Sequence, residues 1–180
     1  ELELRKAFPD KNIAFVLSDV RSRARMKAVF EHYRPEFVFH AAAYKHVPMV
    51  EANPCEGVMT NIWGTVNTAN HAVRYGAEKF VMISTDKAIN PTNVMGASKR
   101  IAELCVQGFN ADGSGTQYII TRFGNVLGSN GSVIPLVREQ RARCGTVPVA
   151  HPGMIRYVMN LSAACRLAHQ DPTMGSGGEL

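Results

Sequence analysis

The segment from Ile83 to Lys99 combines residue types that can carry out acid–base chemistry. An apolar run at 80–83 leads into Ser-Thr-Asp-Lys at 84–87, and Met-Gly-Ala-Ser-Lys follows at 95–99. A hydroxyl, a carboxylate and two amines are the groups needed to move a hydride with a bound cofactor and then to eliminate water. Thr-Asp-Lys is also an ordinary polar turn after a strand, and taken alone the two interpretations are about even.

Lys99 follows Met95 by four residues, so both are predicted to share one face of a helix. A lysine beside a nicotinamide ribose can bond its hydroxyls, and its charge lowers the pKa of a nearby acid. Met95 has no proton to give and cannot act as a base. Without the surrounding motif, Met95 is better explained as a core methionine.

Other polar residues follow predicted strands. Asp19 ends one of them, where an acid can accept a hydrogen bond from an adenine amino group or cap the next helix, and position alone does not decide. Asn61 is interpreted as part of a polar outer helix face, the alternative being a bond to a neighbouring backbone segment. His40 and His46 have no acid or cysteine at metal-ligand spacing, so no metal site is predicted.

The composition is that of a soluble globular domain, with 180 residues, 46% hydrophobic and 19% charged. No apolar run approaches the roughly 20 residues of a membrane helix, and no secretory leader opens the chain, so no membrane contact is expected from this segment. The four cysteines are widely spaced and form no Cys-x-x-Cys pair. Their spacing argues against zinc and against a disulfide scaffold and fits a reducing cytoplasm.

The formal net charge of +5 comes from scattered basic residues and two clusters, at 21–27 and 138–143. Both clusters fall on predicted amphipathic helices, where a solvated face is a commoner cause than nucleic-acid binding. No nucleic-acid partner is therefore expected, although an anionic small ligand would also suit such a surface.

Short apolar runs alternate with helical patterns along the chain. Strands are predicted at 12–17, 37–40, 79–84 and 117–121, and helices at 22–33, 55–75, 93–110, 132–143 and 162–169. This alternation predicts an α/β fold with a doubly wound parallel sheet. Ligands of such sheets bind beyond the carboxyl ends of the strands, where most of the candidate residues fall.

Five segments together resemble the polysaccharide-biosynthesis branch of the extended short-chain dehydrogenase/reductases, most closely the UDP-N-acetylglucosamine 4,6-dehydratases. They are residues 39–48, 60–65, 83–88, 90–99 and 122–129. The resemblance covers nearly the whole chain. Its most specific part is Ser-Thr-Asp-Lys combined with Asn-Pro-x-Asn-x-Met-Gly-x-x-Lys.

The resemblance implies a Rossmann-like sheet truncated at both ends. Residues 1–125 would form an NAD(P)-binding core that lacks its first strand and Gly-rich loop, and residues 126–180 a partial sugar-nucleotide region. It also implies a cytoplasmic homo-oligomer as the full-length protein, placed at the inner membrane if membrane helices lie upstream.

The resemblance also assigns roles to individual residues. NAD or NADP would contact Asp19 and Val20 at its adenine, Ala41, Ala42 and Ala43 along the dinucleotide, Lys45 nearby, and Lys99 at the nicotinamide ribose. The UDP-sugar would contact Lys87, Asn125 and Arg156, the last through its diphosphate. The catalytic set would comprise Thr85, Asp86, Lys87, Met95 and Lys99.

The implied reaction has three steps. The C4 hydroxyl of the sugar is oxidised, Lys87 then removes the C5 proton while Asp86 protonates the departing C6 hydroxyl, and hydride returns to C6. Met95 stands where the superfamily has a tyrosine, which leaves the base of the first step open among Thr85, Asp86 and Lys87. Two other interpretations are a sugar-nucleotide epimerase, which needs no Asp–Lys pair, and a non-catalytic NAD(P)-binding protein.

The 180-residue chain on its own is expected to bind NAD(P) poorly and to be inactive, because it contains no Gly-x-Gly-x-x-Gly loop to cradle the pyrophosphate. Incubating the isolated chain with NAD(P) and a UDP-sugar tests this. Detectable turnover would overturn the expectation.

Overall fold

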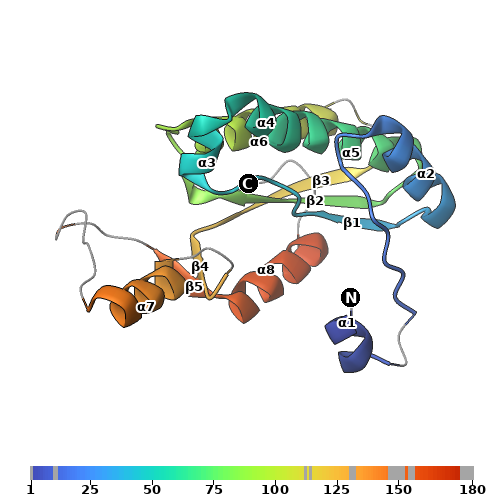
Figure 1. Ribbon diagram of the computed structural model, residues 1–180. Coiled ribbons are helices and arrows are strands. Elements are labelled where there is room, and N and C mark those ends of the chain that lie inside the picture. The colour runs from blue at the N-terminus through green and yellow to red at the C-terminus, as the bar shows by residue number, and fades with distance from the viewer. Residues whose placement is uncertain are drawn as a thin grey trace.

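A three-stranded parallel sheet forms the centre of the computed structural model, which describes residues 2–9, 12–111, 113, 115–129, 133–145, 153 and 157–174. Its strands lie in the order β1, β2, β3 (Figure 1), with bounds Phe37–His40, Lys79–Thr85 and Gln117–Phe123. Phe37 pairs with Lys79, and Lys79 with Gln117. The predicted α/β class is confirmed.

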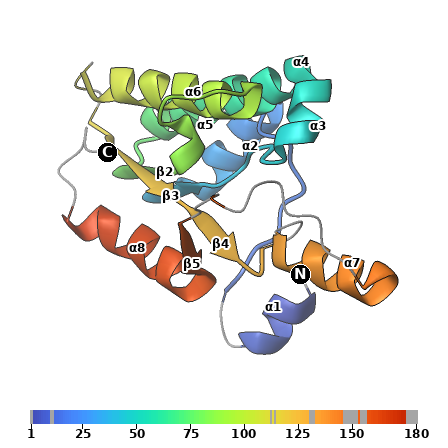
Figure 2. The same cartoon turned by 90° about the vertical axis from the view of Figure 1, so that its left-hand side faces the viewer.

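Helices cover both faces of this sheet, as expected of a doubly wound fold (Figure 2). One face carries α2 (Arg23–Tyr33), α5 (Gly64–Arg74) and α6 (Val94–Ala111). The other carries α8 (Leu161–Met174), which contacts β2 and β3. The remaining elements are α1 (Leu2–Ala7), α3 (Val47–Ala52), α4 (Pro54–Val58), α7 (Val133–Cys144), and the strands β4 (Asn125–Leu127) and β5 (Val158–Asn160), which pair in parallel.

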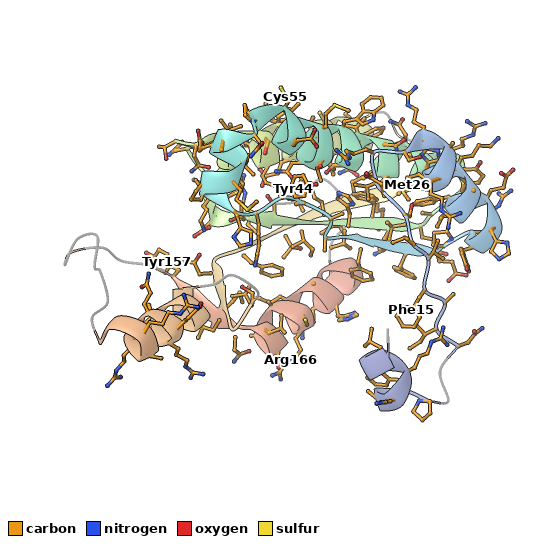
Figure 3. All side chains as sticks on the ribbon, viewed as in Figure 1. Phe15, Met26, Tyr44, Cys55, Tyr157 and Arg166 are labelled. Atoms are coloured by element: carbon orange, nitrogen blue, oxygen red, sulfur yellow. The ribbon has the colours of Figure 1, made fainter. Side chains whose placement is uncertain are left out.

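The core lies between the sheet and the first helical face. Phe80, Met82 and Tyr118 of the central strands are fully buried. Aromatic and small residues of the helices pack against them, so the apolar spacing read from the sequence is the buried face of each helix. Met26 lies on the side of α2 that faces this core (Figure 3).

The predicted helix near Ser22 forms with the expected cap. The hydroxyl of Ser22 accepts a hydrogen bond from the backbone N–H of Arg25 at 3.3 Å. At the other end Arg34 adopts a left-handed conformation with φ 43°. Because Pro35 disfavours helical geometry in the residue before it, α2 ends there.

Two expectations need correction. Residues 12–17 do not form a strand, because they pair with no strand among the described residues, and Leu17 is 94% exposed. The helix predicted over 55–75 is real but interrupted. It runs as α4, a π-helical turn at Met59–Trp63 and α5. The helix α3 and the strands β4 and β5 were not predicted.

Within the described residues, no helix is both long and apolar enough to cross a bilayer.

Asn110 of α6 covers the outer edge of β3. Its amide donates to the carbonyl of Tyr118 at 2.8 Å and accepts from the N–H of Tyr118 at 2.9 Å, in the manner of a neighbouring strand. We expect Asn110→Ala to lower the free energy of unfolding in urea by about 2 kcal/mol, because a buried donor and acceptor lose their partners. The control is Asn70→Ala, whose exposed amide bonds only the Val66 carbonyl within its own helix. Equal effects of the two variants would contradict this role for Asn110.

Candidate active site

The carboxyl end of β2 gathers three of the predicted catalytic side chains. Thr85 is the last strand residue, and its hydroxyl accepts from the backbone N–H of Lys87 at 3.3 Å, which starts a short 3₁₀ turn at Asp86–Ala88. The same hydroxyl donates to Oδ1 of Asp86 at 3.0 Å. Nζ of Lys87 donates to that oxygen at 3.1 Å. A hydroxyl, a carboxylate and an amine therefore form one hydrogen-bonded group.

Asn125 joins this group from a different strand. It is the first residue of β4, and its side-chain oxygen accepts from Nζ of Lys87 at 3.2 Å. The ammonium of Lys87 is thus held between a carboxylate and an amide oxygen that lies 38 residues further along the chain. Asp86 and Lys87 remain about one third exposed, so the group is accessible to a ligand.

Asp86 is ionised in this arrangement. Partial burial alone would raise the pKa of its carboxyl, but the hydrogen bonds from Lys87 and Thr85 outweigh it and lower the pKa below its usual value. The resting state is therefore an ion pair with the proton on Lys87.

Gly96 lets α6 approach the turn that carries this pair. A Cβ at position 96 would collide with the carbonyl oxygen of Lys87 and would touch the ring of Pro91. The Met-Gly-Ala-Ser-Lys segment of α6 therefore needs glycine for packing beneath the site.

Lys99 lies deeper than the Asp86–Lys87 pair. It is 5% exposed, and its ammonium donates to the carbonyl of Ile83 at 2.7 Å, one residue beyond the last β1–β2 pair. Burial lowers its pKa to about 8, and the nearby charge of Glu103 acts in the opposite direction. Met95, one helical turn earlier, is also buried, which confirms the shared face and the core character of the methionine.

His40 ends β1 close to Lys99. It is buried, its Nε2 lies 2.9 Å from the hydroxyl of Thr65, and burial together with the charge of Lys99 lowers its pKa to about 3. The ring is therefore neutral, and its Nε2 has a hydrogen-bonding partner in the Thr65 hydroxyl.

The sequence suggested that Asn61 belongs to an outer polar face of its helix. This interpretation is wrong, because Asn61 is completely buried. Its amide accepts from the N–H of Tyr44 at 2.7 Å and donates to the carbonyl of Tyr44 at 3.0 Å and to the hydroxyl of Ser98 at 2.9 Å. The π-helical turn that contains Asn61 thus fixes the backbone that follows β1. Tyr44 can be seen beside the helical layer in Figure 3.

The predicted dinucleotide residues at the end of β1 adjoin a cavity of about 530 Å³. Ala43 and Lys45 line it, while Ala41 and Ala42 lie just before them in the same segment between β1 and α3. The ammonium of Lys45 lies 3.3 Å from the hydroxyl of Ser129, which follows β4. Two segments predicted to contact different parts of the ligands are thereby in contact with each other.

Asp19 is paired with a side chain of its own loop. Its carboxylate accepts hydrogen bonds from Arg21, and these bonds lower the pKa of Asp19. Arg21 also contacts Glu56 at 2.6 Å. The carbonyl of Val20 accepts from the amide of Asn67 at 2.6 Å, which fastens the loop to α5. Arg156 lies outside the described residues.

Glu103 is a site residue that the sequence analysis missed. It is completely buried below Ser84 and accepts hydrogen bonds from Ser84 and from the guanidinium groups of Arg122 and Arg100. One signal was available, because Glu103 lies four residues after Lys99, on the helix face that Met95 and Lys99 were predicted to share.

Comparison with known proteins shows the family. The whole chain, residues 1–180, matches the family of polysaccharide biosynthesis proteins, and it belongs to that family. The chain is 49% identical to the capsular polysaccharide biosynthesis protein CapD of Staphylococcus aureus, over 99% of this chain and 30% of that protein.

Relatives with different activities match over similar stretches. A UDP-N-acetylglucosamine 4,6-dehydratase (inverting) of Campylobacter jejuni is 34% identical, over 100% of this chain and 54% of the relative. A UDP-glucose 4-epimerase of Rickettsia rickettsii is 37% identical, over 99% of this chain and 52% of the relative. The chain thus spans about half or less of the length of these curated relatives.

Solved structures confirm the Rossmann-like fold. Pen from Bacillus thuringiensis superposes with a TM-score of 0.89 at 38% identity, over 98% of this chain and 54% of that one. A dTDP-glucose 4,6-dehydratase of Streptomyces venezuelae, DesIV, in a structure with NAD bound, has a TM-score of 0.87 over 99% of this chain and 60% of that one. Its identity of 23% supports the fold alone.

The buried ammonium of Lys99 makes a prediction about stability and pH. Below its folded pKa of about 8, Lys99 is protonated in both states, and the folded chain bears the full cost of burying the charge. As the pH rises toward 10.5, the ordinary pKa of a lysine, only the folded state has lost the proton, so folding becomes more favourable. We expect the unfolding free energy, relative to a Lys99→Met variant, to rise by about 2 kcal/mol between about pH 7 and pH 10.

Denaturant titrations across this pH range measure that difference. The control is Lys45→Met, which removes an exposed lysine and is expected to give a flat difference. A flat profile for Lys99→Met would show that its ammonium is not desolvated.

Proposed function

We propose that the chain is the catalytic part of an NAD(P)-dependent UDP-sugar 4,6-dehydratase, acting on UDP-N-acetylglucosamine within a longer protein. The proposal includes the predicted division, with residues 1–125 binding the cofactor and 126–180 contributing to the sugar-nucleotide site. One observation carries it. Lys87 is hydrogen-bonded at once to Asp86 and to Asn125, so an acid–base pair lies in contact with a residue proposed to bind substrate.

The residues at the end of β1 fit a dinucleotide. They combine small side chains and a mostly apolar hollow with the ammonium of Lys45 at its wall. Such hollows with a few polar groups are typical of cofactor sites. Bound NAD or NADP would accept hydride from C4 of the sugar and return it at C6. Ala41 to Ala43 and Lys45 would line it, with Lys99 toward the nicotinamide ribose and Asp19 and Val20 toward the adenine.

The Asp86–Lys87 pair can supply both the acid and the base of the elimination. At rest the proton is on Lys87, and the two groups lie 3.1 Å apart. A docked sugar excludes water, which disfavours the charged pair. The proton then moves to Asp86, leaving a neutral amine beside a protonated acid. Lys87 takes the C5 proton, and Asp86 protonates the C6 hydroxyl, which leaves as water.

The proton balance closes over one cycle. Lys87 returns a proton to C5 as C6 is reduced. The proton released by the C4 hydroxyl in the first step replaces the one that Asp86 loses with water, which restores the resting ion pair. Thr85 is hydrogen-bonded to Asp86 and can pass on the C4 proton, although Asp86 and Lys87 themselves remain alternatives for this base. Met95 is buried and takes no part in proton transfer.

Sugar-nucleotide epimerisation is the second candidate function, favoured by the 37% identity to a UDP-glucose 4-epimerase. An epimerase returns the hydride to the carbon from which it came and has no need of an acid that expels a hydroxyl. The hydrogen-bonded position of Asp86 supports the dehydratase.

Lys87→Ala should separate the steps of the proposed reaction. The experiment uses the full-length protein with NAD(P) and UDP-N-acetylglucosamine in deuterated water. We expect the unmodified enzyme to release water and to incorporate solvent deuterium at C5. The variant should lose the C5 exchange and should turn over about 10²- to 10⁴-fold more slowly. Lys6→Ala removes an exposed lysine of α1, which is distant in sequence from Lys87, and serves as the control. Undiminished exchange in Lys87→Ala, or a product that keeps the substrate's mass, would refute the proposal.

A further inference from the structure

A second hollow lies among the helices α2, α5 and α6. Its volume is about 680 Å³, within the range of small-molecule sites. Residues of α2 and α5 line it, together with Trp63 of the π-helical turn before α5 and Phe109 of α6. None of the residues proposed for catalysis, cofactor or sugar binding takes part in its wall.

The charge of this hollow has one sign. Arg23, Lys27 and Arg74 line it, and no aspartate or glutamate does. Within the part of the chain that the structure describes, none of the three forms an ion pair. Arg23 and Lys27 occupy successive turns of one helix face, where like charges repel. An anionic ligand would relieve this repulsion.

The walls of the hollow are already ordered. The guanidinium of Arg23 stacks over the ring of Trp63 at 4.4 Å from its centre, and the indole N–H donates to the carbonyl of Arg21 at 3.3 Å. Nδ1 of His71 is hydrogen-bonded to the carbonyl of Asn67 at 2.7 Å. A stacked guanidinium keeps its edge for bidentate recognition of phosphate. Ligand binding at the Arg23–Trp63 stack therefore loses little side-chain entropy.

The length of the hollow indicates what kind of anion fits. Trp63 and Arg74 both line it and are eleven residues apart along α5 and the turn before it. This corresponds to roughly 16 Å of helix, which is more than an inorganic anion occupies and matches a nucleotide with its phosphates. We propose that the hollow binds a nucleotide as a separate ligand, with its ring at the Arg23–Trp63 stack and its phosphates at Lys27 and Arg74.

Calorimetric titration with ATP tests this site. The full-length protein is titrated with ATP in the presence of saturating NAD, so that the cofactor site is occupied. We expect ATP to bind, and Lys27→Gln with Arg74→Gln to weaken it at least about tenfold, since two charge-assisted contacts are lost. The matched control is Arg138→Gln with Arg141→Gln, which removes the same charge from the exposed side of α7. The control should change the affinity less than about twofold.

Four results would overturn the proposal. They are no binding of ATP, equal weakening by the two double variants, weakening of ATP binding by Lys87→Ala, and inorganic phosphate binding as tightly as ATP. The third would place ATP at the strand ends, and the last would show an anion site without selectivity for a nucleotide.

Discussion

The buried carboxylate of Glu103 is the constraint on which the site depends. A charge without solvent is costly unless it is paired and hydrogen-bonded, and here Ser84, Arg122 and Arg100 supply the partners. Burial alone would raise the pKa of Glu103, but the hydrogen bonds from Arg122, Ser84 and Arg100 keep the pKa below its usual value. Since those partners belong to β2, β3 and α6, a shift of β2 or β3 relative to α6 would remove a hydrogen bond from the buried carboxylate.

The geometry of the proposed catalytic residues follows from this anchor. Ser84 directly precedes Thr85, and Arg122 lies three residues before Asn125, so the network fixes the two strand ends whose side chains meet at Lys87. On the same helix, Lys99 ties α6 to the carbonyl of Ile83. A rigid base of this kind holds the Asp86–Lys87 pair in place while leaving its outer side open to ligand, which is what a preorganised acid–base site requires.

Features set by local sequence could be predicted, and features set by distant partners could not. The apolar run of β2 and the 3.6-residue spacing of α6 depend on neighbouring residues, so both elements form within one or two residues of expectation. Residues 12–17 have the same local character as a strand, but a strand also needs a partner beside it. Glu103 and Asn61 are polar residues in helices, which predicts exposure, and only tertiary contacts explain their burial. Likewise, the motifs marked Lys87 and Asn125 separately, whereas their contact is visible only in the fold.

The central claim is that hydride leaves C4 and returns at C6 of one sugar. The most direct measurement gives the full-length protein UDP-N-acetylglucosamine that carries deuterium at C4, together with unlabelled NAD(P). NMR then locates the deuterium in the product. The account predicts deuterium on the C6 methyl group of a 4-keto-6-deoxy sugar that has lost water. Deuterium returned to C4 of a sugar that keeps its C6 hydroxyl would contradict it.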